Sequence, residues 1–128
     1  MKSPIDIAGA LYDAINANDM PAIMALYAPD VRISQSTALP WGGEYEGLAG
    51  LARFGAALRL HIDSKVTIER FIEAGDEIVV LGRTIGKTKQ TKTPFNVAIV
   101  HVLSARNEKI VRAQYFIDTP AMLKALKA

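Results

Sequence analysis

Apolar residues recur every three or four positions in three segments of the first half of the chain, residues 5–15, 23–27 and 48–58. This spacing predicts amphipathic helices that each bury one face. The string SPID supplies a start signal for the first helix, because Ser3 can cap it, the proline suits its first turn and Asp6 follows three residues after the cap. A cap at Asn18 or Asp19 begins the second helix.

The string APD at residues 28–30 ends the second helix, and a strand-like run follows it. The remaining apolar runs are rich in β-branched residues and are separated by the turn strings GDE, KTKQTK and SARNEK, so they predict antiparallel strands. The expected strands are residues 31–36, 65–74, 78–86, 94–103 and 110–118, and a short helix over 119–127 closes the chain. This order predicts one α+β domain, residues 1–128, with helices on one face of a sheet.

Two of the expected strands are apolar at both alternating positions. They are residues 78–82 and 95–103, whereas a strand with one face in water alternates apolar and polar residues. Helices already cover the first face, so we expect a second copy of the protein to cover the other. The sequence therefore predicts a homodimer that packs through the sheet.

Composition narrows the classes of protein to which the chain can belong. The 128 residues are half apolar and carry a formal net charge of only +2, which separates the chain from disordered and strongly nucleic-acid-binding proteins. The absence of cysteine excludes disulfides, thiolate metal sites and a cysteine nucleophile. No signal peptide or apolar span is recognised, so we expect a cytoplasmic protein with neither membrane nor nucleic acid as partner.

Three strings, in this order and spacing, resemble the nuclear transport factor 2-like superfamily, in particular its SnoaL-like and ketosteroid-isomerase-like branch. They are ALYDAINANDMPAIMALYAPDV, LPWGGEYEGLAGLARFGAAL and HVLSARNEKIVRAQYFIDTPAML. The resemblance implies a cone-shaped, strongly curved, mostly antiparallel sheet wrapped around three N-terminal helices. It also implies an apolar cavity open at one end and frequent dimerisation.

The resemblance does not extend to the catalytic residues of the well-understood relatives. The positions of the ketosteroid isomerase acid, base and tyrosine fall on Val100, Gln35 and Leu11. Those of the limonene-epoxide-hydrolase constellation fall near Val80, Gly82 and Tyr115. The resemblance therefore supports the fold and the cavity while arguing against both reactions.

Three side chains remain as candidate catalytic groups. Asp118 ends an apolar strand, where burial could raise the pKa of a carboxyl, although DTPAML also makes it a helix cap. His101 could exchange a proton near neutral pH, yet a histidine on an apolar strand is more often structural. Tyr115 falls where relatives project a polar group inward, and a half-buried strand position explains it equally well.

Five further residues are candidates for binding a ligand: Tyr12, Gln35, Trp41, Phe54 and Val100. Trp41 follows the apolar Leu39 in a glycine-rich loop, and the resemblance places that loop at the rim of the cavity. We expect the indole to close the mouth of the pocket. The alternative is that the indole fills space at the edge of the core or in the dimer contact.

These observations predict a protein that binds a small hydrophobic molecule, with an isomerase, cyclase or hydratase step as its candidate chemistry. No cofactor is required. Two distant histidines without HExxH or a carboxylate cluster do not predict a metal site. The alternative is a non-catalytic ligand carrier or a dimeric interaction module, which the scarcity of buried carboxylates favours.

Overall fold

The computed structural model describes residues 2–128, which form four helices and six strands. The helices are α1 (Pro4–Asn16), α2 (Met20–Ala25), α3 (Gly47–His61) and α4 (Thr119–Lys127). The strands are β1 (Tyr27–Gln35), β2 (Gly43–Glu46), β3 (Ile62–Ala74), β4 (Glu77–Thr88), β5 (Pro94–Arg106) and β6 (Lys109–Ile117).

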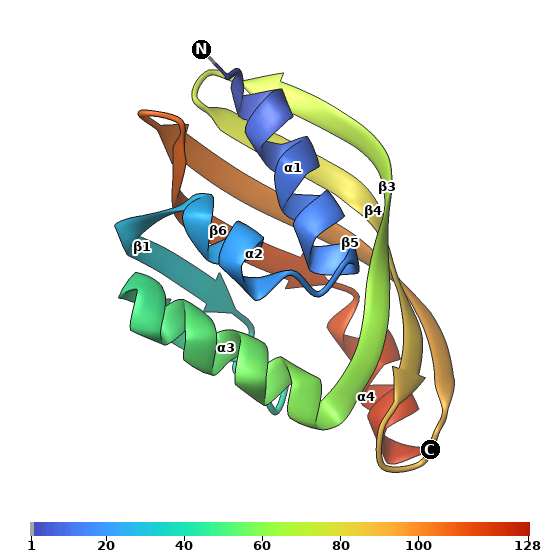
Figure 1. Ribbon diagram of the computed structural model, residues 1–128. Coiled ribbons are helices and arrows are strands. Elements are labelled where there is room, and N and C mark those ends of the chain that lie inside the picture. The colour runs from blue at the N-terminus through green and yellow to red at the C-terminus, as the bar shows by residue number, and fades with distance from the viewer. Residues whose placement is uncertain (1) are drawn as a thin grey trace.

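The strands form a single curved, unclosed sheet in the order β2-β1-β6-β5-β4-β3. Only β1 and β6 run parallel; the other neighbours are antiparallel. Figure 1 shows β3 and β4 bending along their length, with α1, α2 and α3 on the concave side. The α+β class, the curved, mostly antiparallel sheet around N-terminal helices and the short C-terminal helix are thus confirmed.

Local capping explains where three helices begin. The Ser3 hydroxyl accepts from the backbone N–H of Asp6, and the Asp6 carboxylate accepts from the N–H of Ser3, which forms the expected capping box. Asp19 caps α2 and Asp118 caps α4 through single side-chain bonds of 3.2 Å. Each bond satisfies a backbone donor that the first helical turn leaves free.

The sequence prediction is wrong about the segment between α2 and α3. Tyr27, expected on the second helix, is the first residue of β1, because it pairs with Ile110 of β6. The bond from the Ile110 N–H to the Leu26 carbonyl (2.8 Å) fixes this junction. The stretch expected to be only loop contains β2, where Tyr45 pairs with Ile33. Both errors arise because strand pairing between distant segments overrides the local helical spacing.

Alternation along β5 separates the two faces of the sheet. The inward residues are buried: Phe95, Val97, Ile99, His101 and Leu103. The residues between them, from Asn96 to Val100, face outward and are exposed. The core therefore lies between the concave face and the helices, and the convex face of β5 is open to solvent in the single chain.

A close backbone approach marks the bend between β3 and β4. Gly82 pairs with Ile68, next to a register shift in β3, and a Cβ atom at Gly82 would lie 2.2 Å from the carbonyl oxygen of Thr67. Such a distance is far below van der Waals contact. Only glycine permits this approach without displacing the strand.

We predict that Gly82→Ala lowers the free energy of unfolding by roughly 2–3 kcal/mol, because the methyl group forces β3 away from β4. Gly9→Ala is the matched control: nothing lies within 4 Å of its Cβ position inside α1, so it should stabilise the protein by about 0.5–1 kcal/mol. Urea unfolding measures both changes. Equal effects of the two substitutions would contradict this account of the bend.

Candidate functional site

A cavity of about 540 Å³ lies between the concave face of the sheet and the helices. Its wall is largely apolar and includes the buried side chains of Trp41, Leu51, Phe54, Ile62 and Ile99. Strands β5 and β6 form its floor, and α3 forms one side. A volume of this size accommodates a small organic molecule.

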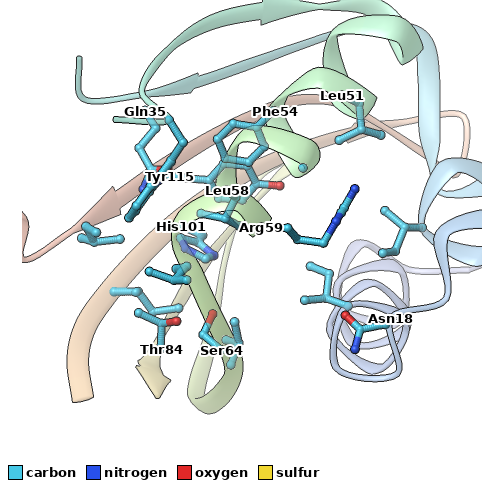
Figure 2. Close-up of a pocket in the computed structure, with 18 of the residues that line it drawn as sticks. Asn18, Gln35, Leu51, Phe54, Leu58, Arg59, Ser64, Thr84, His101 and Tyr115 are labelled. Carbon is cyan, nitrogen blue, oxygen red and sulfur yellow. The ribbon is translucent and has the colours of Figure 1, made fainter. Parts of the chain in front are cut away.

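The exposed lining residues show where the cavity meets solvent. They are Asn18, Arg59, Asp63 and Lys89. Figure 2 shows Asn18 and Arg59 on one side of the cavity, with Gln35 and Tyr115 on the other. The cavity therefore has a charged rim and an apolar interior.

His101 of β5 is held from the side of α1. The hydroxyl of Tyr12 lies 2.7 Å from its Nδ1 atom, and the two rings stack with centroids 5.8 Å apart. Burial without a nearby carboxylate lowers the pKa of His101 to about 3, so the imidazole is neutral at neutral pH. Burial, followed by the charge of Tyr115, raises the pKa of Tyr12 far above its usual value, and its hydroxyl keeps its proton.

Tyr115 of β6 lies directly opposite His101 in the β5–β6 ladder, and the two ring centroids are 4.6 Å apart. Its hydroxyl lies 2.6 Å from that of Tyr27. Burial raises the pKa of Tyr115 to about 12, although the hydrogen bond with Tyr27 acts in the opposite direction. Burial also raises the pKa of Tyr27 well above its usual value, with further contributions from Tyr115 and Tyr12. Both phenols therefore stay protonated.

Trp41 forms part of the inner wall. Its Nε1–H donates to Oε1 of Gln35 at 2.8 Å, and its backbone carbonyl accepts from the hydroxyl of Tyr45 at 2.9 Å. Only 1% of Trp41 is exposed, so the indole is a wall of the cavity instead of the lid expected at its mouth. Phe54 of α3 stacks on Tyr115 with ring centroids 5.5 Å apart.

The structure brings five of the eight candidate residues to the cavity: Gln35, Trp41, Phe54, His101 and Tyr115. Tyr12 does not line it and reaches it only through His101. Val100 points to the convex face with 38% of its surface exposed, because neighbouring strand residues face opposite sides. Asp118 is exposed and caps α4, outside the set of lining residues.

A model of the SnoaL-like domain matches residues 8–113, most of the chain. The chain belongs to this SnoaL-like family. No match is found among curated proteins.

Solved structures of this fold are similar over nearly the whole SnoaL-like chain. An NTF2-like protein of unknown function from Burkholderia pseudomallei is 27% identical, with a TM-score of 0.93 and complete coverage of both chains. TerC, co-crystallised with polyporic acid, is 26% identical, with a TM-score of 0.91 and 98% coverage of both. A putative polyketide cyclase from Pseudomonas putida, 18% identical with a TM-score of 0.84 and 98% coverage of both, shares the fold.

Sequence reasoning missed several residues of the SnoaL-like cavity. The helical spacing places Tyr27 on a helix face, which conceals its contact with Tyr115. Thr84 is buried at an inward position of β4, and the alternation that places Val80 inward could have identified it. The rim residues Arg59 and Lys89 carry no local signal, since only the tertiary fold brings them to the opening.

The side chains that line the cavity are better suited to hydrogen bonding with a ligand than to catalysis by charged acidic groups. Among residues 2–128, Asp63 at the rim is the one acidic residue that lines it. No group of three or more His, Cys, Asp or Glu in the same residues is placed to hold a metal ion. No helix within residues 2–128 is sufficiently long and apolar to cross a membrane.

The buried neutral His101 predicts a specific acid sensitivity. Its folded pKa lies below the unfolded value of 6.5, so the unfolded chain takes up a proton first as pH falls. Its contribution to stability is thus complete above pH 6.5 and lost as pH falls toward 3. Relative to His101→Gln, which cannot titrate, the wild type should lose about 3 kcal/mol of unfolding free energy between roughly pH 6.5 and pH 4.

Chemical denaturation of both proteins across this range makes the comparison. The carboxylates titrate in both, so the difference between the two curves isolates His101. Parallel curves would show that the imidazole is not desolvated in the folded state.

Proposed function

We propose that the protein binds a small, largely apolar organic molecule in this cavity and acts on it as a cofactor-independent isomerase, cyclase or hydratase. The observation that carries the proposal is the cavity itself: about 540 Å³ of mostly apolar wall, with His101 and Tyr115 side by side on its floor. Few polar groups in an apolar enclosure orient a ligand by hydrogen bonds while burial supplies affinity.

The comparisons support a small organic ligand. TerC was crystallised with polyporic acid, and several neighbours of lower identity are described as putative polyketide cyclases. Those descriptions concern the relatives. For this chain they agree with the size and apolar character of the cavity.

The side chains on the floor suit reactions in which negative charge develops on a substrate oxygen. Neutral His101 and protonated Tyr115 can hydrogen-bond such an oxygen within a largely apolar wall, where each bond is stronger than in bulk solvent. Asp63 is the available carboxylate for proton transfer, at the rim. A substrate proton that moves during the reaction would accordingly lie near the opening.

A second candidate function is a non-catalytic ligand carrier. The observation that favours it is the lack of any carboxylate among the buried residues that line the cavity within residues 2–128. Binding alone requires the apolar wall and the hydrogen-bonding floor, but no base.

A cavity-filling substitution tests the binding site. Gly55 of α3 lines the cavity, and a Cβ atom there would meet only the flexible end of Arg59, at 3.0 Å. We predict that Gly55→Leu folds normally and weakens binding of the bicyclic hydrocarbon tetralin by roughly tenfold or more, since it fills the space that the ligand needs. Calorimetry measures affinity, and fluorescence of the sole tryptophan, Trp41, reports occupancy.

Ala56→Leu is the matched control, because Ala56 is exposed on the same helix and does not line the cavity. It should bind tetralin as the wild type does. Absence of tetralin binding to the wild type, or equal binding by both variants, would contradict the proposed site.

We further propose that the protein is a homodimer that packs through the convex face of the sheet. Val100 and Phe116 are neighbours on this face, with 38% and 52% of their surfaces exposed, and Ile85 on the same face is 40% exposed. Polar residues such as Asn96 and Arg112 lie around this apolar centre. An apolar centre with a polar margin is the usual anatomy of a protein interface.

We predict that Phe116→Lys converts the dimer to a monomer at micromolar concentration, because it places charge in the apolar centre. Leu60→Lys is the control: Leu60 is 75% exposed on α3, which lies on the concave side of the sheet (Figure 1). Size-exclusion chromatography with light scattering measures the mass. A monomeric wild type, or a dimer that survives the substitution at Phe116, would contradict this interface.

A further inference from the structure

Three polar side chains on the inner wall share one feature: each has its hydrogen-bond acceptor next to a donor group of the protein. Nδ1 of His101 lies 2.7 Å from the Tyr12 hydroxyl, the Tyr115 oxygen 2.6 Å from the Tyr27 hydroxyl, and Oε1 of Gln35 2.8 Å from Nε1 of Trp41. All three line the cavity. The direction of these bonds decides what a ligand encounters.

The Gln35 bond has only one possible direction. Indole Nε1–H is a donor without acceptor capacity, so Trp41 donates and the Gln35 carbonyl oxygen accepts. The Gln35 amide group then keeps its two N–H donors, for which no protein acceptor is found among residues 2–128.

The His101 bond has two conceivable directions, and hydrogen-bond satisfaction selects one. Tyr12 is 3% exposed, and His101 is the sole side-chain partner of its hydroxyl among the described residues. If Nδ1 carried the proton, the Tyr12 hydroxyl hydrogen would be buried without an acceptor, which costs about 1–3 kcal/mol. Tyr12 therefore donates to Nδ1, and neutral His101 carries its proton on Nε2.

Nε2 of His101 is left facing the cavity. No hydrogen bond to it is found within residues 2–128, and no side-chain nitrogen or oxygen in that part of the chain is both sealed from solvent and without a partner. Nε2 is consequently reachable from the cavity. Figure 2 shows the imidazole among the residues that line it.

The Tyr115 bond follows the same logic. Tyr27 is 3% exposed and Tyr115 is 8% exposed, so Tyr115 can direct its hydroxyl hydrogen to the cavity more easily than Tyr27 can. Tyr27 is then the donor of the bond between them. Thr84 also lines the cavity, and its hydroxyl can turn to donate or to accept.

We infer that His101, Tyr115 and Gln35 all present hydrogen-bond donors to the cavity, so that the site selects ligands with carbonyl or enolate oxygens over hydrocarbons of the same shape. Tyr12 is the positioning residue that keeps the His101 proton on Nε2. This inference rests on the proposed function, because it concerns the ligand of the same cavity.

The protonation of His101 can be read without any ligand. A long-range ¹H–¹⁵N correlation spectrum of the wild type at neutral pH distinguishes protonated from unprotonated ring nitrogens, and His61→Gln assigns the two histidines. We expect one neutral ring with an unprotonated Nδ1 and a protonated Nε2. A proton on Nδ1, or a charged ring, would overturn the inference whatever the cavity binds.

Selectivity is measured with two probes of nearly equal shape, tetralin and its ketone 1-tetralone. We expect 1-tetralone to bind the wild type about tenfold more tightly, because the hydrocarbon leaves the donors unpaired. Tyr12→Phe keeps the ring that stacks on His101 and removes the hydroxyl. It should mix the two His101 tautomers and reduce the preference for the ketone several-fold, with tetralin binding unchanged.

Tyr45→Phe is the matched control, since it removes the hydroxyl of a half-buried tyrosine that bonds to the Trp41 carbonyl and does not line the cavity. It should leave both the tautomer and the preference unchanged. Tight binding of both probes with no preference would overturn the inference and leave the proposed function standing. Binding of neither probe, with the expected tautomer in the spectrum, would overturn the proposed function.

Discussion

The bend of the sheet is the constraint on which the rest of this structure depends. The backbones of β3 and β4 approach closely at Gly82, next to the register shift in β3, and both strands bend along their length around the helices (Figure 1). A flatter sheet would allow α1 and α3 to pack directly on β5 and β6. The curvature instead separates α3 from part of the floor and leaves a space that the protein's own side chains do not fill.

The core around that space contains several polar side chains. Tyr12, Tyr27, His101 and Tyr115 bring four polar groups into the core without any charge, because burial suppresses ionisation of each. The hydrogen bonds of the Tyr12–His101 and Tyr27–Tyr115 pairs offset most of the free-energy cost of burying polar atoms. The pairs also hold the rings of β5 and β6 in fixed orientations against α1 and β1, so a ligand meets groups that are already positioned.

Much of the architecture could be predicted from the sequence, because its signals are local. The Ser3–Asp6 cap, the helical spacing along α1 and the turn before β6 each involve residues within a few positions of one another. The curvature of the sheet is expected only from the family resemblance. The start of β1 could not be found in this way, because Tyr27 becomes a strand residue only by pairing with Ile110.

The site was less predictable for the same reason. Gln35, Trp41, Phe54, His101 and Tyr115 were recognisable as candidates by type and position, but their arrangement depends on contacts across the fold. The bond between Tyr12 and His101 joins residues 89 positions apart, and that between Tyr27 and Tyr115 joins residues 88 apart. No local pattern encodes which tyrosine meets which partner.

The position of Gly55 on α3 has a consequence for how such a protein can diversify. The donor groups belong to β1, β5 and β6, whereas Gly55, Leu58 and Arg59 line the cavity from one turn of a helix that carries none of them. Exchanges on that turn can change the size of accepted molecules while the chemistry of recognition stays intact. Steric and chemical selectivity are therefore free to evolve separately in this scaffold.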